Sequence, residues 1–305
     1  MSLSQDSHLK ELENEAIHII REVAASFRKP VVLYSVGKDS SVMLWLMKKA
    51  FYPSKIPFPL MHIDTGYKYP EMYEFRDQTI KDLGVELLVE GVEAGDKPEV
   101  HPSEVGMDRC CALLKTGALL KAIQKHGFDA AFGGARRDEE KSRAKERIFS
   151  IRDSFGQWNP KDQRPELWKQ FNTKLAENQS MRVFPLSNWT EKDIWQYIKQ
   201  EEIPVVPLYF AKKRKVIPQG NVWIPVEHQE VAFRRDIAPS EIQEVSCRYR
   251  SLGCIPCTGA VASEAGTLDE VIEEIFSAKR SERENRLIDQ TGDASMEQKK
   301  KEGYF

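Results

Sequence analysis

The sequence lacks long apolar runs and an excess of charge of one sign, and it has only five cysteines. Its 305 residues carry a net charge of −2; 41% of them are hydrophobic and 30% are charged. No apolar run approaches a membrane span, and the balanced charge argues against a general binder of nucleic acid or membranes. Residues 1–15 are polar and acidic, unlike a signal peptide, and the odd cysteine count fits a reducing compartment. These absences favour a globular, cytoplasmic protein.

Short apolar runs alternate with helical patterns over much of the chain. Apolar residues at helical spacing between positions 9 and 27 predict an amphipathic helix that ends at Pro30. A capping box headed by Thr190 predicts a later helix that starts near residue 191. The alternation predicts a parallel sheet with helices on both faces. Strands are expected at residues 31–34, 60–63, 85–89, 130–132 and 183–186, and further helices at 40–50, 70–83, 112–125 and 138–147.

The chain is expected to have three parts. Residues 1–28 form the N-terminal helix, and residues 29–203 form a nucleotide-binding domain. Residues 204–305 form an extension that contacts a partner and is irregular up to residue 250, with a later helix at 268–286. Two segments are candidate partner surfaces: the polar insertion at 152–179 and the basic run at 212–215.

The run after the first strand predicts a phosphate site. Residues 34–42 read Tyr-Ser-Val-Gly-Lys-Asp-Ser-Ser-Val and connect a buried strand to a helix. Such a turn directs backbone N–H groups and a helix N-terminus at one spot, which attracts phosphate or pyrophosphate. The pattern is not a Walker A loop, which has two glycines before its lysine. A polar connection that binds nothing is the alternative. The candidate ligands are Ser35, Gly37, Lys38, Asp39, Ser40 and Ser41.

Two further loops are expected at the same edge of the sheet, since ligands bind at the carboxyl ends of parallel strands. Asp64 ends one strand and could hold magnesium or a ribose hydroxyl, or simply cap the following turn. Gly133 and Gly134 permit close backbone approach after another strand. Arg136 and Arg137 then offer planar forks that suit phosphate or sulfate oxygens. The charges that follow them are also explained by a solvated helix with i, i+4 pairs.

These residues carry a resemblance to known families. The loop at 34–41 resembles the PP-loop of the N-type ATP pyrophosphatases, an adenine nucleotide alpha hydrolase-like α/β fold, with Val36 in place of the first glycine. Over nearly its full length the chain resembles the catalytic small subunits of bacterial heterodimeric ATP sulfurylases. The segments that carry this second resemblance are 34–41, 62–66, 128–147, 164–168, 182–190 and 301–305.

The resemblance implies that ATP and sulfate give adenosine 5′-phosphosulfate and pyrophosphate. It also implies Mg²⁺ and a GTPase large subunit whose GTP hydrolysis drives this uphill step. Sulfate is already an anion, so its attack needs no general base, and positioning and charge neutralisation are enough for catalysis. This agrees with the lack of a nucleophile or catalytic histidine pattern in the sequence. Lys38, Arg136 and Arg137 are the predicted catalytic residues. Arg248 and Arg250 are further candidate sulfate ligands.

Four of the cysteines form two tight pairs, Cys110 with Cys111 and Cys254 with Cys257. Such a set can close a tetrahedral thiolate site. It also resembles the ligand set of the [4Fe–4S] adenylylsulfate reductases, which share the PP-loop fold, and it departs from many ATP sulfurylase small subunits. An iron–sulfur cluster, a zinc ion and four unconnected buried thiols all stay open. Cys247 is the remaining cysteine and is expected to be structural.

The cysteine pairs also support a second function, reduction of adenylylsulfate or phosphoadenylylsulfate. Those reductases resemble one another in a C-terminal nucleophilic cysteine, and no cysteine follows Cys257 in this sequence. Without that thiol the sulfo group has no acceptor. The adenylyltransferase is therefore the preferred hypothesis.

Overall fold

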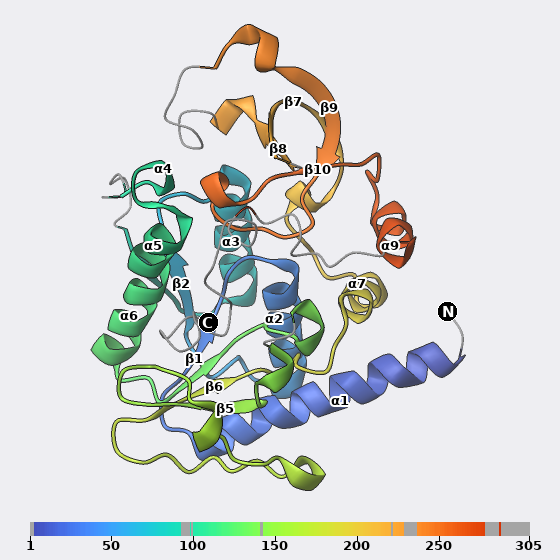
Figure 1. The fold of residues 1–305 in the computed structure, drawn as a ribbon. Helices are drawn as coiled ribbons and strands as arrows, with labels where there is room; N and C mark the ends of the chain where they lie inside the picture. The colour runs from blue at the N-terminus through green and yellow to red at the C-terminus, as the bar shows by residue number, and fades with distance from the viewer. Residues whose placement is uncertain are drawn as a thin grey trace.

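The structure is a computed structural model that describes residues 3–92, 98, 100–140, 143–220, 222–228, 237–277 and 287. Its larger part is a six-stranded sheet with strand order β3-β2-β1-β4-β6-β5 (Figure 1). Neighbouring strands are parallel, except that β5 runs antiparallel to β6 at the edge. The strands are β1 (Pro30–Leu33), β2 (Leu60–Asp64), β3 (Leu87–Gly91), β4 (Ala130–Phe132), β5 (Phe149–Arg152) and β6 (Ser180–Val183).

Helices cover both faces of this sheet, as predicted, because alternate strand residues are apolar on both sides. Val31, Met61 and Ala131 pack against α6 (Ala118–His126) in one cluster. Their neighbours along the strands, among them Val32 and Leu60, belong to the larger core on the other face. Helices on or beside the sheet include α1 (Leu3–Ser26), α2 (Lys38–Phe51), α3 (Pro70–Leu83), α4 (Pro102–Val105), α5 (Met107–Cys111) and α7 (Glu191–Gln200).

The capping box of α7 is present as expected: the Thr190 side chain accepts from the backbone N–H of Asp193, whose carboxylate accepts in return. The helix that contains Cys110 is longer than predicted. It starts at Met107, and a π-helical segment, Ala112–Gly117, joins α5 to α6. π-Helical turns occur often at functional sites, because they change which side chains face a neighbour.

The C-terminal extension is a second, antiparallel sheet, so the prediction of an irregular region at 204–250 is wrong. Its strand order is β10-β9-β7-β8. The basic run at 212–215 lies within β7, where lysines and Pro218 are weak strand formers and hid the strand from sequence reasoning. The elements are β7 (Lys212–Gln219), β8 (Val222–Pro225), β9 (Gln243–Arg248), β10 (Val261–Ala262) and α9 (Leu268–Ser277).

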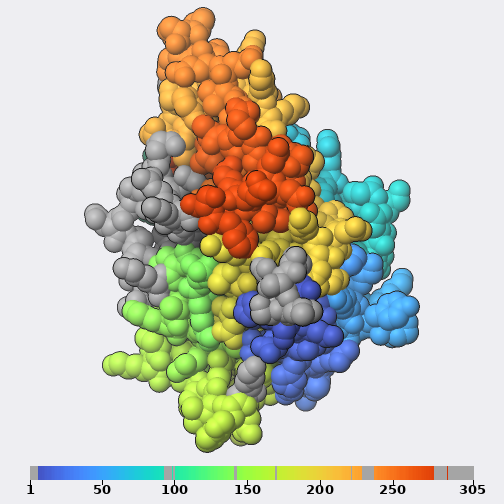
Figure 2. Space-filling model, turned by 90° about the vertical axis from the view of Figure 1, so that its right-hand side faces the viewer, coloured from blue at the N-terminus to red at the C-terminus, as the bar shows by residue number. Residues whose placement is uncertain are grey.

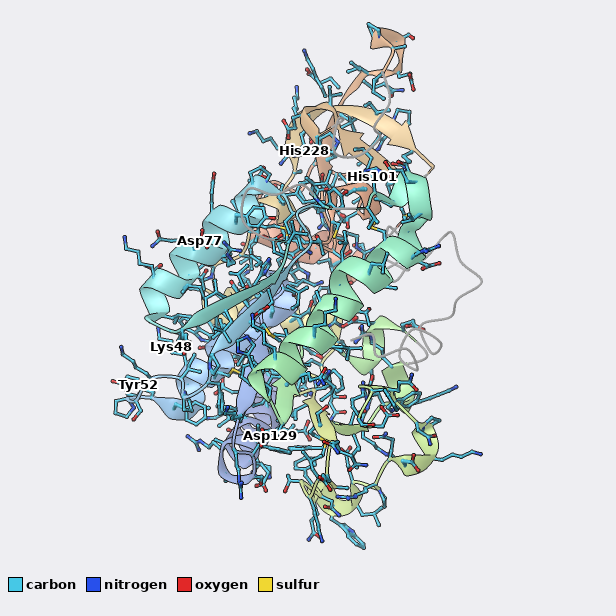
Figure 3. The ribbon with its side chains drawn as sticks, turned by 90° about the vertical axis from the view of Figure 1, so that its left-hand side faces the viewer. Lys48, Tyr52, Asp77, His101, Asp129 and His228 are labelled. Carbon is cyan, nitrogen blue, oxygen red and sulfur yellow. The ribbon has the colours of Figure 1, made fainter. Side chains whose placement is uncertain are left out.

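This extension lies across the carboxyl ends of the large sheet (Figure 1). The backbone N–H of Ile255 donates to the Tyr67 carbonyl at 2.7 Å, and the Tyr69 hydroxyl donates to the Thr258 carbonyl at 2.9 Å. Figure 3 places His101 and His228 toward that end of the molecule and Asp129 toward the other. The extension therefore covers the edge where ligands are expected.

The α9 helix contacts α7 on the face drawn in Figure 2, where orange-red atoms lie beside yellow ones. An ion pair between Lys199 and Asp269, 2.5 Å apart, and Lys192 over the Phe276 ring join them. The predicted continuation of this helix, residues 278–286, and the tail segment at 301–305 lie outside the described residues. No helix in the described ranges combines the length and the apolar composition needed to cross a bilayer.

Two other local predictions need correction. Residues 138–147 are not an α-helix: two short 3₁₀ turns, Arg137–Glu139 and Arg143–Lys145, occupy its described part. Ion pairs outside helical i, i+4 spacing hold this segment, since Arg136 pairs with Asp39 and Glu146 with Arg152. The strand expected at 183–186 ends at Val183, and turns follow it.

Candidate functional site

A cavity of about 200 Å³ opens at the carboxyl edge of the large sheet, and we call it the edge cavity. One wall is apolar and consists of strand-end and helix side chains: Leu33, Met61, Ile63 and Leu119. Most of the predicted nucleotide ligands form another wall: Ser35, Gly37, Lys38, Asp39, Ser40, Gly133 and Gly134. An apolar wall beside a polar loop at a helix N-terminus suits a nucleotide, whose base is flat and whose phosphates are anionic.

The loop end of this cavity is the N-terminus of α2. Gly37 caps the helix without any side-chain hydrogen bond. The Lys38 backbone N–H donates to the Tyr209 hydroxyl at 2.9 Å, which places that hydroxyl at the start of the helix. Ser40 Oγ donates to the Gly37 carbonyl at 2.9 Å and lies 3.3 Å from Ser35 Oγ. Amide dipoles and hydroxyl groups thus gather where an anion is expected.

Val36 holds an unusual backbone conformation within this loop. Its φ is +64°, in the left-handed region, although its side chain is branched and fully buried. That region disfavours β-branched residues, and glycine is the usual occupant. The position where the PP-loop pattern has glycine is therefore the one that bends this way, and strain of this kind is found at functional sites.

The loop containing Gly134 contacts the start of α2 closely. A Cβ added to Gly134 would lie 3.2 Å from the Asp39 Cβ and 3.4 Å from the Ser40 N. Arg136 Nε donates to Asp39 Oδ1 at 2.6 Å, and Lys38 Nζ lies 3.4 Å from Asp39 Oδ2. Asp39 thus joins the two loops and shares its charge between two cations.

The predicted arginine ligands do not line the edge cavity. The Arg136 side chain is enclosed by its ion pairs. Arg137 donates to the Asn188 amide oxygen at 2.6 Å, on the outer side of the loop. Arg248 pairs with Glu274 at 2.8 Å, and Arg250 with Glu191 at 2.9 Å. The structure therefore gives these four guanidinium groups carboxylate or amide partners in place of the cavity.

Asp64 and Ser41 also lie outside the lining of this cavity. Asp64 Oδ1 accepts from the Gly66 backbone N–H at 2.8 Å and from the Tyr73 hydroxyl at 2.7 Å. This geometry supports the turn-capping alternative that the sequence left open for Asp64.

Several cavity residues were missed by sequence reasoning. Lys68, Lys115 and Arg143 add cations, and Tyr209 and Gly253 come from the extension. Arg143 lies 3.4 Å from Glu139, the i, i+4 partner that suggested a solvated helix. The sequence around Lys68 and Lys115 did not mark them as site residues, apart from their positions after a strand and after a cysteine pair, because a lone lysine is usually a surface residue.

The four paired cysteines line a second cavity, which we call the cysteine cavity. Cys110 and Cys111 end α5, while Cys254 and Cys257 come from the extension. Burial raises the pKa of the Cys110 thiol to about 11, and Cys254 and Cys111 add to the rise. Burial and the same neighbours also raise the pKa of Cys257. These mutual effects place the four sulfurs within electrostatic range of one another.

The described residues include no group of three or more histidine, cysteine or carboxylate side chains arranged around a single metal ion. A zinc ion needs its four ligands within ~2.3 Å of one centre. Each cysteine of a [4Fe–4S] site instead binds a separate iron, so its ligands surround a larger group. Four thiols around one cavity are a donor set that suits such a group. Cys247 is buried in β9 and does not line this cavity.

The two cavities share a wall made of Lys68, Lys115 and Gly253. Lys68 Nζ lies 3.9 Å from Cys254 Sγ, and Thr65 Oγ1 lies 3.1 Å from the same sulfur. Next to this wall, burial and the Lys68 charge lower the pKa of His62 to about 4. His62 Nδ1 lies 2.9 Å from the Tyr34 carbonyl oxygen, so the neutral ring donates to it.

Comparisons with known proteins agree with this architecture. Residues 29–260 match the phosphoadenosine phosphosulfate reductase domain family. The sulfate adenylyltransferase subunit 2 of Phocaeicola vulgatus is 58% identical over 304 residues, and the match covers 98% of both chains. That of Marinomonas sp. is 55% identical over 309 residues, and the match covers 100% of both chains.

A phosphoadenylyl-sulfate reductase structure from Candida auris matches with a TM-score of 0.46 and 18% identity, over 68% of this chain and 92% of that one. The family match and the full-length relatives decide the assignment. The chain belongs to the phosphoadenosine phosphosulfate reductase domain family and, within it, to the sulfate adenylyltransferase subunit 2 proteins.

Proposed function

We propose that this chain transfers the adenylyl group of ATP to sulfate, giving adenosine 5′-phosphosulfate and pyrophosphate. A sulfate oxygen forms a bond to the α-phosphorus while the bond from that phosphorus to the β-phosphate oxygen breaks. No proton has to move, because sulfate is already an anion and pyrophosphate leaves as one. The observation that carries the proposal is the N-terminus of α2, with glycine as its N-cap, in the edge cavity of a chain 55% to 58% identical to sulfate adenylyltransferase subunit 2 relatives.

The loop end of the edge cavity would stabilise the leaving pyrophosphate. Backbone N–H groups of α2, the Ser35 and Ser40 hydroxyls and the Lys38 ammonium group supply the positive potential. The apolar wall would take the adenine ring. Mg²⁺ would enter with the triphosphate, since it usually keeps substrate phosphates among its ligands.

The four arginines would act without contacting the substrate, by holding the residues that do. Arg136 would hold Asp39, and through it Lys38 and the Gly134 loop. Arg137 would anchor the same loop to Asn188, while Arg248 and Arg250 would hold the extension over the cavity. Catalysis would then depend on preorganised charge and not on a nucleophilic side chain.

A GTPase large subunit would drive the reaction, because formation of the phosphate–sulfate anhydride is unfavourable. The relatives' designation as subunit 2 implies a partner subunit for those proteins. Two exposed surfaces are candidates for its binding: the insertion, where Phe155, Leu167 and Trp168 are exposed, and the lysines of β7.

The four paired cysteines would hold a [4Fe–4S] cluster. Their shared cavity and their origin in two distant segments support this. A bound cluster would supply a redox-sensitive charge beside the shared wall. Anaerobic purification followed by iron and sulfide analysis tests this; stoichiometric zinc, or no metal, would contradict it.

The reaction is tested by pyrophosphate release from ATP with sulfate, measured with the co-purified partner and with or without GTP. GTP-stimulated release that depends on sulfate supports the proposal. Thioredoxin-dependent sulfite release from adenylylsulfate, without pyrophosphate release, would favour the reductase that the cysteines also suggest.

A further inference from the structure

A third cavity, of about 300 Å³, lies between α2 and α3, and we call it the helix cavity. Among the residues that the structure describes, it shares no lining residue with the edge cavity. Its lining residues recur at helical spacing, so one face of α2 and one face of α3 border the same space. Most of them are apolar, and the apolar ones are Leu44, Trp45, Phe75, Leu83, Ile203 and Pro204.

The inner end of the helix cavity is polar. Ser41 and Thr79 line it, and both are less exposed than the outer lining residues Gln78 and Asp82. Burial raises the pKa of Tyr34, and the nearby Ser41 and Thr79 hydroxyls lower it in part. The Tyr34 side chain is only 1% exposed, and within the described part of the chain its hydroxyl has no hydrogen-bond partner. Because a buried hydroxyl without a partner is unfavourable, a ligand that brings a hydrogen-bonding group to this end is favoured.

The lining also favours an aromatic ligand without a net charge. Trp45 and Phe75 contribute aromatic rings to the wall. The polar groups at the inner end are hydroxyls, so a charged group there would lose its hydration without gaining a counter-charge. The charged lining residues already have contacts on the protein, since Lys48 Nζ lies 4.6 Å from the centre of the Trp45 ring. Asp82 accepts from Gln78 Nε2 at 2.6 Å.

The same inner end contacts the loop at 34–41. Tyr34 lines the edge cavity, while its hydroxyl lies beside Ser41 and Thr79 of the helix cavity. The Ser41 backbone N–H donates to the Gly37 carbonyl at 3.0 Å, in the first turn of α2. A group bound at this end would therefore touch the helix turn whose N–H groups border the edge cavity.

We propose that the helix cavity is an effector site for a small, uncharged aromatic molecule with one hydroxyl or amide group, and that its occupation strengthens phosphate binding at the loop end. The ligand would hold Tyr34 and Ser41 in the arrangement that directs the start of α2 at the edge cavity. Both ligands then favour one conformation of the loop, so each raises the affinity for the other. This site goes beyond adenylyl transfer, and binding of the aromatic ligand does not depend on that reaction.

The first test measures binding of phenol and of toluene to the full chain by calorimetry, because toluene has a methyl group in place of the hydroxyl. Tyr34→Phe is expected to lower the ratio of phenol affinity to toluene affinity about three- to tenfold, since the partner hydroxyl is lost. Tyr249→Phe removes another buried hydroxyl without a partner in the described residues, does not alter the helix cavity, and should keep the ratio. An unchanged ratio in Tyr34→Phe, or an equal fall in both variants, would overturn the hydroxyl contact.

Blocking variants locate the site. Leu83→Trp and Gln78→Trp each add a bulky ring to the lining and should abolish phenol binding, with a thermal melt to check the fold. Gln78 is exposed, so its replacement is the less disruptive of the two. Phenol binding retained in both folded variants would overturn the site. Benzoate should bind more weakly than phenol, and tighter binding of benzoate would overturn the uncharged class.

The coupling is measured as the affinity of the chain for pyrophosphate with and without saturating phenol. Phenol is expected to raise this affinity about five- to tenfold in the wild-type chain and to have no effect in Gln78→Trp. Equal pyrophosphate affinities with and without bound phenol would overturn the coupling. Phenol binding without any pyrophosphate binding would overturn both the coupling and the role proposed above for the loop end, while the aromatic site itself would stand.

Discussion

The two ends of the edge cavity are built from different interactions. At the loop end, two loops meet through Asp39, which contacts both Lys38 and Arg136. At the end that faces the cysteine cavity, which we call the thiol end, Lys68 Nζ lies 3.9 Å from Cys254 Sγ, and Gly253 leaves no room for a Cβ beside Thr258. The loop end is a charge network joined through Asp39, while Lys68 at the thiol end contacts a sulfur atom.

This difference suggests that the two ends of the edge cavity have different functions. A network in which one carboxylate holds two cations is rigid, and a rigid set of donors suits a leaving group whose charge develops in the transition state. A lysine beside a thiol can be tuned by what happens to that thiol. The loop end is therefore expected to determine turnover, and the thiol end to determine affinity for the second substrate.

The largest expected effect is at the loop end. Lys38→Met should lower kcat about 100-fold, because one preorganised donor to the leaving pyrophosphate is lost. The fold should survive, since Asp39 keeps Arg136 as its partner. Pyrophosphate release measures the turnover, and a thermal melt measures the stability. Lys48→Met, at an exposed position of the same helix, is the control. Normal turnover, or a large fall in melting temperature, would contradict this role.

Glycine substitutions can test the roles of the two ends of the edge cavity one at a time. In Gly134→Ala the new Cβ meets the start of α2 at 3.2 to 3.4 Å, so kcat should fall about tenfold as the loops move apart. In Gly253→Ala the Cβ would lie 2.3 Å from Thr258 Oγ1, so the KM for sulfate should rise instead. Gly266→Ala, whose nearest contact is 3.8 Å, is the control. If both variants changed the same kinetic constant, the division between the ends would be wrong.

Stability should depend on pH through His62. Because its folded pKa, about 4, lies below the ordinary value of 6.5, the unfolded chain binds the proton more readily between these values. This stability is complete above pH 6.5 and is lost as the pH falls toward 4. Between pH 7 and about pH 5 the loss should be about 2 kcal/mol. Denaturant titrations should show a flatter profile for His62→Gln, and parallel profiles for the two proteins would disprove the assignment.

The smallest expected effect concerns Val36. Val36→Gly loses a buried side chain but relieves a left-handed conformation that costs a β-branched residue about 1–2 kcal/mol. Val32→Gly removes an equally buried side chain from β1 without that relief. The unfolding free energy should therefore fall about 1–2 kcal/mol less in Val36→Gly than in Val32→Gly. Equal losses would show that the bend at residue 36 carries no strain.

Much of the large sheet follows from its sequence, because strands such as β1 and β4 are short apolar runs with helical patterns between them. The loop at 35–40 and the pair Gly133 and Gly134 were placed at one edge by the same reasoning, and both line the cavity. The small sheet was missed, since β7 contains lysines and a proline and depends on pairing with β8 and β9.

The sequence by itself determined the alternation of strands and helices up to residue 132, the phosphate-type loop and the spacing of the cysteine pairs, because these depend on local pattern. Only the tertiary structure decided which cations face the cavity. Long side chains have many rotamers, and partners far along the chain select among them: Asp39 and Arg136 are 97 residues apart, and Lys68 and Cys254 are 186 apart. That is why the four predicted arginines have partners outside the cavity while Lys68, Lys115 and Arg143 line it.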